Sequence, residues 1–84
     1  MINILQATLI APYRIQLDFS DGKTGVWNAE TLLEERKGTL LEPLRDATYF
    51  QRFFIDAGAL CWPNSLEFSP ERLYEQCEFV LKAA

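Results

Sequence analysis

The stretch that most constrains this chain is residues 53–76, FFIDAGALCWPNSLEFSPERLYEQ. It predicts a strand, a tight turn, a second strand and a helix, in that order. Gly58 tolerates a positive φ, which favours a two-residue hairpin loop made by Ala57 and Gly58. With this loop, Ile55 pairs with Leu60 on one face of the hairpin.

The same register pairs Phe53 with Trp62, so four large apolar side chains share one face and can seed a core. We therefore expect Trp62 to be a core residue. Pro63 ends the second strand, because proline has no N–H to give to a strand ladder. Ser69 followed by Pro70 then indicates the start of a helix, with a capping hydroxyl and a proline at the first helical position.

The N-terminal part of the chain predicts a meander of strands. Residues 2–11 form an apolar strand with Leu5, Ala7 and Leu9 on one face. Residues 13–19 alternate apolar and polar side chains, the pattern of a half-buried antiparallel strand.

The sequence Ser-Asp-Gly-Lys at residues 20–23 predicts a hairpin turn, and residues 24–27 predict the returning strand. A two-residue loop at the tip of this turn places Leu17 opposite Val26. Asn28 is a suitable N-cap for the segment that follows.

Two helical regions follow from capping residues and spacing. A short helix is predicted over residues 29–37, with Gly38 just beyond its end. Residues 39–50 favour helical turns, because Pro43 forbids one continuous helix.

In the terminal helix an apolar stripe is made of Leu73, Cys77, Val80, Leu81 and Ala84. Phe79 lies outside that stripe.

The order β-β-β-α-β-β-α predicts an α+β fold. Antiparallel hairpins carry a short middle helix and a C-terminal helix packed on one face. We expect residues 1–84 to form a single domain.

The composition excludes several classes of function. The chain has no histidine, so Ser-His-Asp and Cys-His nucleophile systems are impossible. No metal-ligand spacing and no phosphate-binding loop is visible, so we expect no metal, no cofactor and no enzymatic activity.

The net charge of −4 disfavours direct binding to nucleic acid or to an anionic membrane. No secretory signal or transmembrane segment is evident, so we expect a cytoplasmic protein with two unpaired cysteines.

Two surfaces are candidates for binding. The first is the corner after the central hairpin, where Trp62, Asn64, Ser65 and Glu67 could form a recognition loop. The alternative is a structural corner whose polar groups satisfy the backbone. The second candidate is Phe79, an aromatic side chain on the outer face of the terminal helix.

Glu75 and Glu78 would give Phe79 an acidic rim, the arrangement of an apolar contact surrounded by charge. The opposing interpretation packs Phe79 against the protein itself or into a homodimer.

The whole chain resembles a small bacterial family of unknown function. The matching features are Phe19-x-Asp21-Gly22, Val26-Trp27-Asn28, Leu44-x-Asp46, Gly58, Trp62-Pro63-Asn64, Ser69-Pro70 and Leu73-Tyr74. Ser65 stands where the family pattern has glycine, and Glu67 stands where it has aspartate. The resemblance implies an α+β domain whose relatives occur alone or before a helix-turn-helix domain. Some of those relatives are described as components of toxin–antitoxin pairs.

We therefore predict a non-enzymatic protein-interaction module, antitoxin-like or regulatory, that binds a small basic protein or a second copy of itself. The alternative is a domain that senses or binds a small molecule, with a pocket near Trp62, Asn64 and Glu67. A further expectation is that no DNA-binding domain is appended within these 84 residues.

Overall fold

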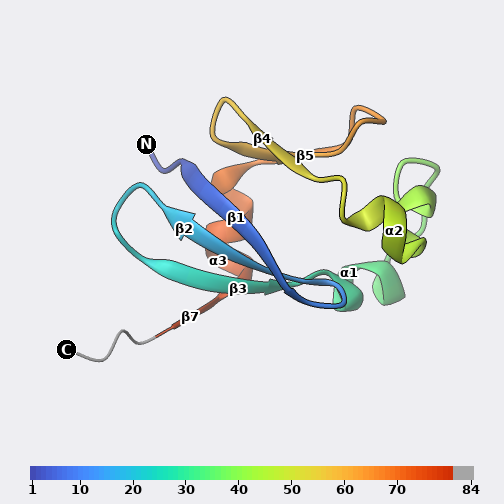
Figure 1. Ribbon diagram of the computed structural model, residues 1–84, viewed down its shortest axis with the longest axis horizontal. Coiled ribbons are helices and arrows are strands. Elements are labelled where there is room, and N and C mark those ends of the chain that lie inside the picture. Colours follow the sequence, from blue (N-terminus) through green and yellow to red (C-terminus); the bar gives the residue numbers. More distant parts are fainter. Residues whose placement is uncertain (81–84) are drawn as a thin grey trace.

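The computed structural model describes residues 1–80, and Figure 1 shows the arrangement of its helices and strands. The elements in chain order are β1 (Ile4–Ala11), β2 (Arg14–Phe19), β3 (Thr24–Asn28), α1 (Ala29–Glu35), the 3-10 helix η1 (Glu42–Arg45), α2 (Ala47–Phe50), β4 (Phe54–Asp56), β5 (Ala59–Cys61), β6 (Glu67–Phe68), α3 (Pro70–Gln76) and β7 (Glu78–Phe79). The predicted α+β class is confirmed, and the predicted order holds with the two-residue strands β6 and β7 added.

The first sheet has the strand order β1-β2-β3-β7, and all of its pairings are antiparallel. The predicted alternation in β2 is confirmed, since Ile15, Leu17 and Phe19 are all buried. The register between β2 and β3 differs by one residue from the prediction, because Leu17 lies opposite Gly25 and not opposite Val26.

The hairpin loop between β2 and β3 explains this shift. The Phe19 N–H donates to the Lys23 carbonyl at 2.9 Å, and the Gly22 N–H donates to the Phe19 carbonyl at 3.0 Å. Gly22 has φ of 89°. The loop therefore has three residues, a turn followed by a left-handed glycine, and the extra residue moves every later pair by one.

The strand β1 carries two irregularities that the sequence pattern did not indicate. The register with β2 shifts between Ile4 and Gln6 and again between Leu9 and Ala11. The bulge after Ile4 turns Leu5 outward, so that 67% of this residue is exposed. The prediction that Leu5 shares a face with Ala7 and Leu9 is therefore wrong, because a bulge changes the side on which the following residues lie.

The second sheet has the order β4-β5-β6, and it confirms the predicted central hairpin. Ile55 lies opposite Leu60, and Ala57 and Gly58 both have positive φ, 51° and 80°. Two consecutive residues with positive φ are typical of the two-residue hairpin turns that match strand twist. In Figure 1 this hairpin lies beside β1, which is the outermost strand of the first sheet on that side.

The helices before the central hairpin follow their predicted signals closely. The Asn28 side chain accepts a hydrogen bond from the Glu30 N–H at 3.0 Å and so caps α1, which ends two residues before the predicted end. The helical turns expected over residues 39–50 are η1 and α2. Asp46 caps α2 by accepting from the Thr48 N–H at 2.9 Å.

The terminal helix is shorter than predicted. It ends at Gln76, and the chain then turns into β7, which pairs with β3 through Gly25 opposite Phe79. The predicted stripe is wrong beyond Cys77, and its last two members, Leu81 and Ala84, lie outside the described residues.

The free edge of β3 is the physical reason for this early end. The Val80 N–H donates to the Thr24 carbonyl at 2.8 Å, so the strand pairing supplies hydrogen bonds that a longer helix would have supplied internally. A side chain at position 25 would collide with the sulfur of Cys77, so Gly25 allows the close approach of this segment.

Aromatic side chains fill the core between the two sheets. The Trp27 and Trp62 rings lie 6.5 Å apart between centroids, and each contacts Phe68 at 5.1 and 5.8 Å. Cys61 and Cys77 are buried free thiols, and burial raises the pKa of both above the usual value. A raised pKa keeps each sulfur in the protonated thiol form.

Candidate functional site

Trp62 is a core residue, as predicted. Only 1% of its surface is exposed, and its indole Nε1 donates a hydrogen bond to the Phe50 carbonyl at 2.9 Å. The ring also contacts Phe50 and Phe53, with centroids 5.4 and 6.2 Å away. The polar group of this side chain is therefore used inside the fold.

The polar residues of the corner also bind the protein itself. The Asn64 amide Nδ2 donates to the Leu40 carbonyl at 3.0 Å, and the Asn64 N–H donates to the Tyr49 hydroxyl at 3.0 Å. These bonds tie the corner to the segment before η1 and to α2. The exposed Ser65 adopts a φ of 73°, in the left-handed region where glycine is favoured.

Glu67 lies apart from these residues. It is exposed on β6 and lines a cleft of about 470 Å³ together with Leu32, Arg36 and Arg72. Neither Trp62 nor Asn64 lines this cleft. The structure therefore does not bring the predicted corner residues together into one pocket.

Phe79 lies on the strand β7 and not on a helix, which corrects the predicted helix-borne surface. It also has internal partners, since its ring lies 4.8 Å from Tyr74 and 6.2 Å from Phe19 between centroids. The Lys23 Nζ lies over the ring at 5.3 Å from its centroid. Phe79 is still 43% exposed, so it forms the outer edge of an aromatic cluster.

The neighbouring Tyr74 connects this cluster to the first hairpin. Its hydroxyl donates to a carboxylate oxygen of Asp21 at 2.7 Å. This hydrogen bond stabilises the charged carboxylate and lowers the pKa of Asp21 below its usual value.

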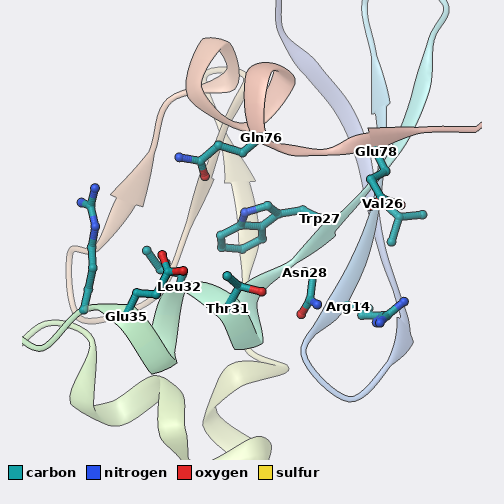
Figure 2. A pocket seen from close by; sticks show the side chains of 10 residues that line it. Arg14, Val26, Trp27, Asn28, Thr31, Leu32, Glu35, Gln76 and Glu78 are labelled. Atoms are coloured by element: carbon teal, nitrogen blue, oxygen red, sulfur yellow. The ribbon is translucent and has the colours of Figure 1, made fainter.

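A second cleft, of about 500 Å³, lies where the end of β3 meets α1 and the end of α3, and no sequence pattern indicated it. Figure 2 shows Trp27 at its centre, with Leu32 and Glu35 on one side and Arg14 and Val26 on the other. The Trp-Asn pair at residues 27–28 was identified only as the start of a helix.

Trp27 differs from the other residues of this cleft in its burial. It is 2% exposed, yet its indole Nε1 has no hydrogen-bond partner among residues 1–80. The described chain contains no fully buried side-chain nitrogen or oxygen without a partner, so this N–H reaches the space of the cleft. The cleft therefore offers a hydrogen-bond donor on an otherwise buried aromatic side chain.

Four charged residues surround Trp27, and they are Arg14, Arg36, Glu35 and Glu78. None of them forms an ion pair in the part of the chain that the structure describes, where the recorded ion pair joins Arg45 to Glu42 at 3.2 Å. The cleft thus carries two positive and two negative groups that do not neutralise one another by direct contact.

The outer edge of β1 is a third surface feature. Because the Phe19 N–H points to β3, alternation along the ladder directs the backbone groups of Ala7 and Leu9 away from β2. No backbone hydrogen bond is recorded for these groups within residues 1–80, whereas Ile4 donates to the Gly58 carbonyl at 2.9 Å. An unpaired strand edge of this kind can pair with another strand.

An apolar groove of about 320 Å³ continues this edge. It lies between the end of β1 and α2 and is lined by Leu9, Ile10, Pro12, Ala47, Phe50 and others. Leu5 and Ile10, the two residues of β1 without a partner in the β2 ladder, are exposed to 67% and 49%.

Residues 1–80 contain neither a membrane-spanning helix nor a metal-binding cluster. No helix in this range is long and apolar enough to span a membrane, and no three side chains of the His, Cys, Asp or Glu type are grouped to hold a metal ion.

A family model described as "Protein of unknown function (DUF2442)" matches residues 4–79 of the chain. No curated protein and no solved structure matches it.

Proposed function

The chain belongs to the DUF2442 family, whose function is unknown, and from this premise we propose that the domain is a non-enzymatic module that binds another protein. The observation that supports this proposal is the unpaired edge of β1. A partner segment in extended conformation would add a strand there and bond to the outward backbone groups of Ala7 and Leu9.

Side chains at both ends of this edge would add apolar contacts. Leu5 and Ile10 flank the regular part of β1, at its two register shifts, and both are exposed. A side chain of the partner near Ile10 could enter the groove against α2. Backbone pairing would supply affinity in this arrangement, and the groove would supply specificity.

Charge favours a basic partner. The domain has a net charge of −4, and no charged side chain occurs in its first 13 residues, so β1 itself offers no charged group to deter strand pairing. A small basic protein in the cytoplasm would suit an antitoxin-like or regulatory role.

The proposal is tested with proline at two neighbouring positions of β1. Ala7→Pro removes an N–H that makes no backbone hydrogen bond within residues 1–80, so it should cost much less stability than the loss of a hydrogen bond of the β1–β2 ladder. Thr8→Pro is the matched control, since the Thr8 backbone faces β2 and its loss should destabilise the domain. Wild type and Ala7→Pro are then used as baits, and each captured protein is titrated in purified form against both.

Binding that is lost in a folded Ala7→Pro variant would support strand addition at β1. Binding that persists unchanged in this variant would contradict it. Sedimentation of the wild type alone covers the case of self-association, where a dimer abolished by Ala7→Pro would identify a second copy as the partner.

Binding of a small molecule is the second candidate function, and the Trp27 cleft is the observation that favours it.

A further inference from the structure

We propose that the Trp27 cleft binds a small zwitterion of the amino-acid type. The ligand carboxylate would accept the hydrogen bond of the Trp27 indole and face a guanidinium, while the ligand ammonium would face a glutamate. This inference rests on the second candidate function and is independent of strand addition at β1.

The indole N–H is the first part of the argument. A tryptophan can only donate through Nε1, so the group it needs in the cleft is an acceptor. Buried tryptophan side chains usually find such a partner within the protein, as Trp62 does with the Phe50 carbonyl. Trp27 is buried to the same extent and has none among the described residues, which leaves the position open to water or to a ligand oxygen.

The charges of the cleft specify the rest of the ligand. Arg14 and Arg36 favour a carboxylate, because guanidinium groups match its two oxygens. Glu35 and Glu78 oppose a plain anion and attract an ammonium group. With equal numbers of unpaired groups of each sign, a ligand that carries both charges complements the cleft better than either charge alone.

The size and walls of the cleft agree with a small ligand. Its volume of about 500 Å³ lies within the range of known small-molecule sites, about 300–1,000 Å³. Val26 and Leu32 lie on opposite sides of Trp27 and provide apolar surface for the ligand side chain (Figure 2).

The two tryptophans provide the readout. In a two-dimensional nitrogen–proton NMR spectrum each indole N–H gives one signal, and Trp27→Phe assigns them. The twenty standard amino acids are added singly at about 10 mM, ten times a millimolar Kd. At least one should shift the Trp27 signal saturably while the Trp62 signal stays in place, because the Trp62 N–H is bound inside the core.

Each amino acid that shifts the signal is then compared with two analogues, the acid without its amine and the amine without its carboxylate. Both should bind at least about tenfold more weakly, since each loses a charge-assisted contact. An acid that binds as tightly as the zwitterion would overturn the zwitterion class while leaving small-molecule binding intact. No saturable shift with any amino acid would overturn the proposal.

Variants locate the charges. Arg14→Gln and Arg36→Gln test the two guanidiniums, and at least one should weaken binding about tenfold or more. Arg72→Gln is the matched control, because Arg72 is exposed but does not line this cleft. Equal effects of all three variants would indicate a long-range charge effect and would contradict direct contact.

Discussion

Trp27 and Trp62 are neighbours in one core, and they differ in a single hydrogen bond. Both are almost fully buried, and their rings lie 6.5 Å apart between centroids. The Trp62 N–H is bound to a backbone carbonyl, whereas the Trp27 N–H faces a cleft without a partner among the described residues. Burial alone therefore does not separate a structural tryptophan from one that can contact a ligand.

The two tryptophans are distinguished by whether the indole N–H is hydrogen-bonded within the protein. At the Trp62 corner the indole N–H and both polar ends of the Asn64 side chain are bonded to the backbone of the protein. Around Trp27 the donor and four nearby charged groups are left for solvent or a ligand. The first region is a structural support, and the second is the one that we propose as a binding site.

The largest expected effect is at Trp62. Trp62→Ala should lower the free energy of unfolding by about 3–5 kcal/mol, because it removes a large buried ring and leaves a cavity. Small domains have about 5–15 kcal/mol in total, so this variant should be close to unfolded at room temperature. Urea or thermal denaturation followed by circular dichroism measures it. A shift in Tm of only a degree or two would mean that the ring does not support the core.

The paired substitutions Trp62→Phe and Trp27→Phe compare the two N–H groups directly. Both lose similar ring area, but Trp62→Phe also leaves the Phe50 carbonyl buried without its donor. We expect it to cost about 1–2 kcal/mol more than Trp27→Phe. Urea denaturation of the two variants side by side gives the difference in unfolding free energy. Equal losses would refute the claim that only the Trp62 N–H is bonded within the protein.

The smallest effect is expected at Ser65, within the Trp62 corner. Its φ of 73° is strained for serine and relaxed for glycine, so Ser65→Gly should stabilise the domain by up to about 1 kcal/mol. Ser69→Gly is the control, because Ser69 has a φ of −66° and caps α3 by accepting from the Arg72 N–H. This control should lose a few tenths of a kcal/mol. A loss at Ser65 as large as at Ser69 would show that the left-handed backbone carries no strain.

The sequence predicted the parts of the fold that depend on adjacent residues. The hairpin at Ala57 and Gly58 has its predicted register, because two neighbouring residues determine the turn. The caps at Asn28 and Ser69 and the core position of Trp62 were predicted for the same local reason.

The errors arose where distant segments compete for the same backbone. The end of α3 was misplaced because β3 offers an open edge, which no local helical pattern reveals. The turn at residues 20–22 gained one residue because the Asp-Gly pair suits either loop length. The Trp27 cleft could not be predicted, since whether an indole N–H finds a partner depends on three elements meeting in space.

The late position of β7 in the chain affects how the protein is made. The hairpins of the first sheet are complete at Asn28, but the second edge of β3 waits for Glu78 and Phe79. Ribosomes add about 5–20 residues per second, so the nascent sheet spends about 3–10 s with both outer edges open. A strand from another chain could occupy the edge of β3 during that interval, and β7 would then have to displace it. The synthesis of β7 therefore determines when the edge of β3 is closed to a partner.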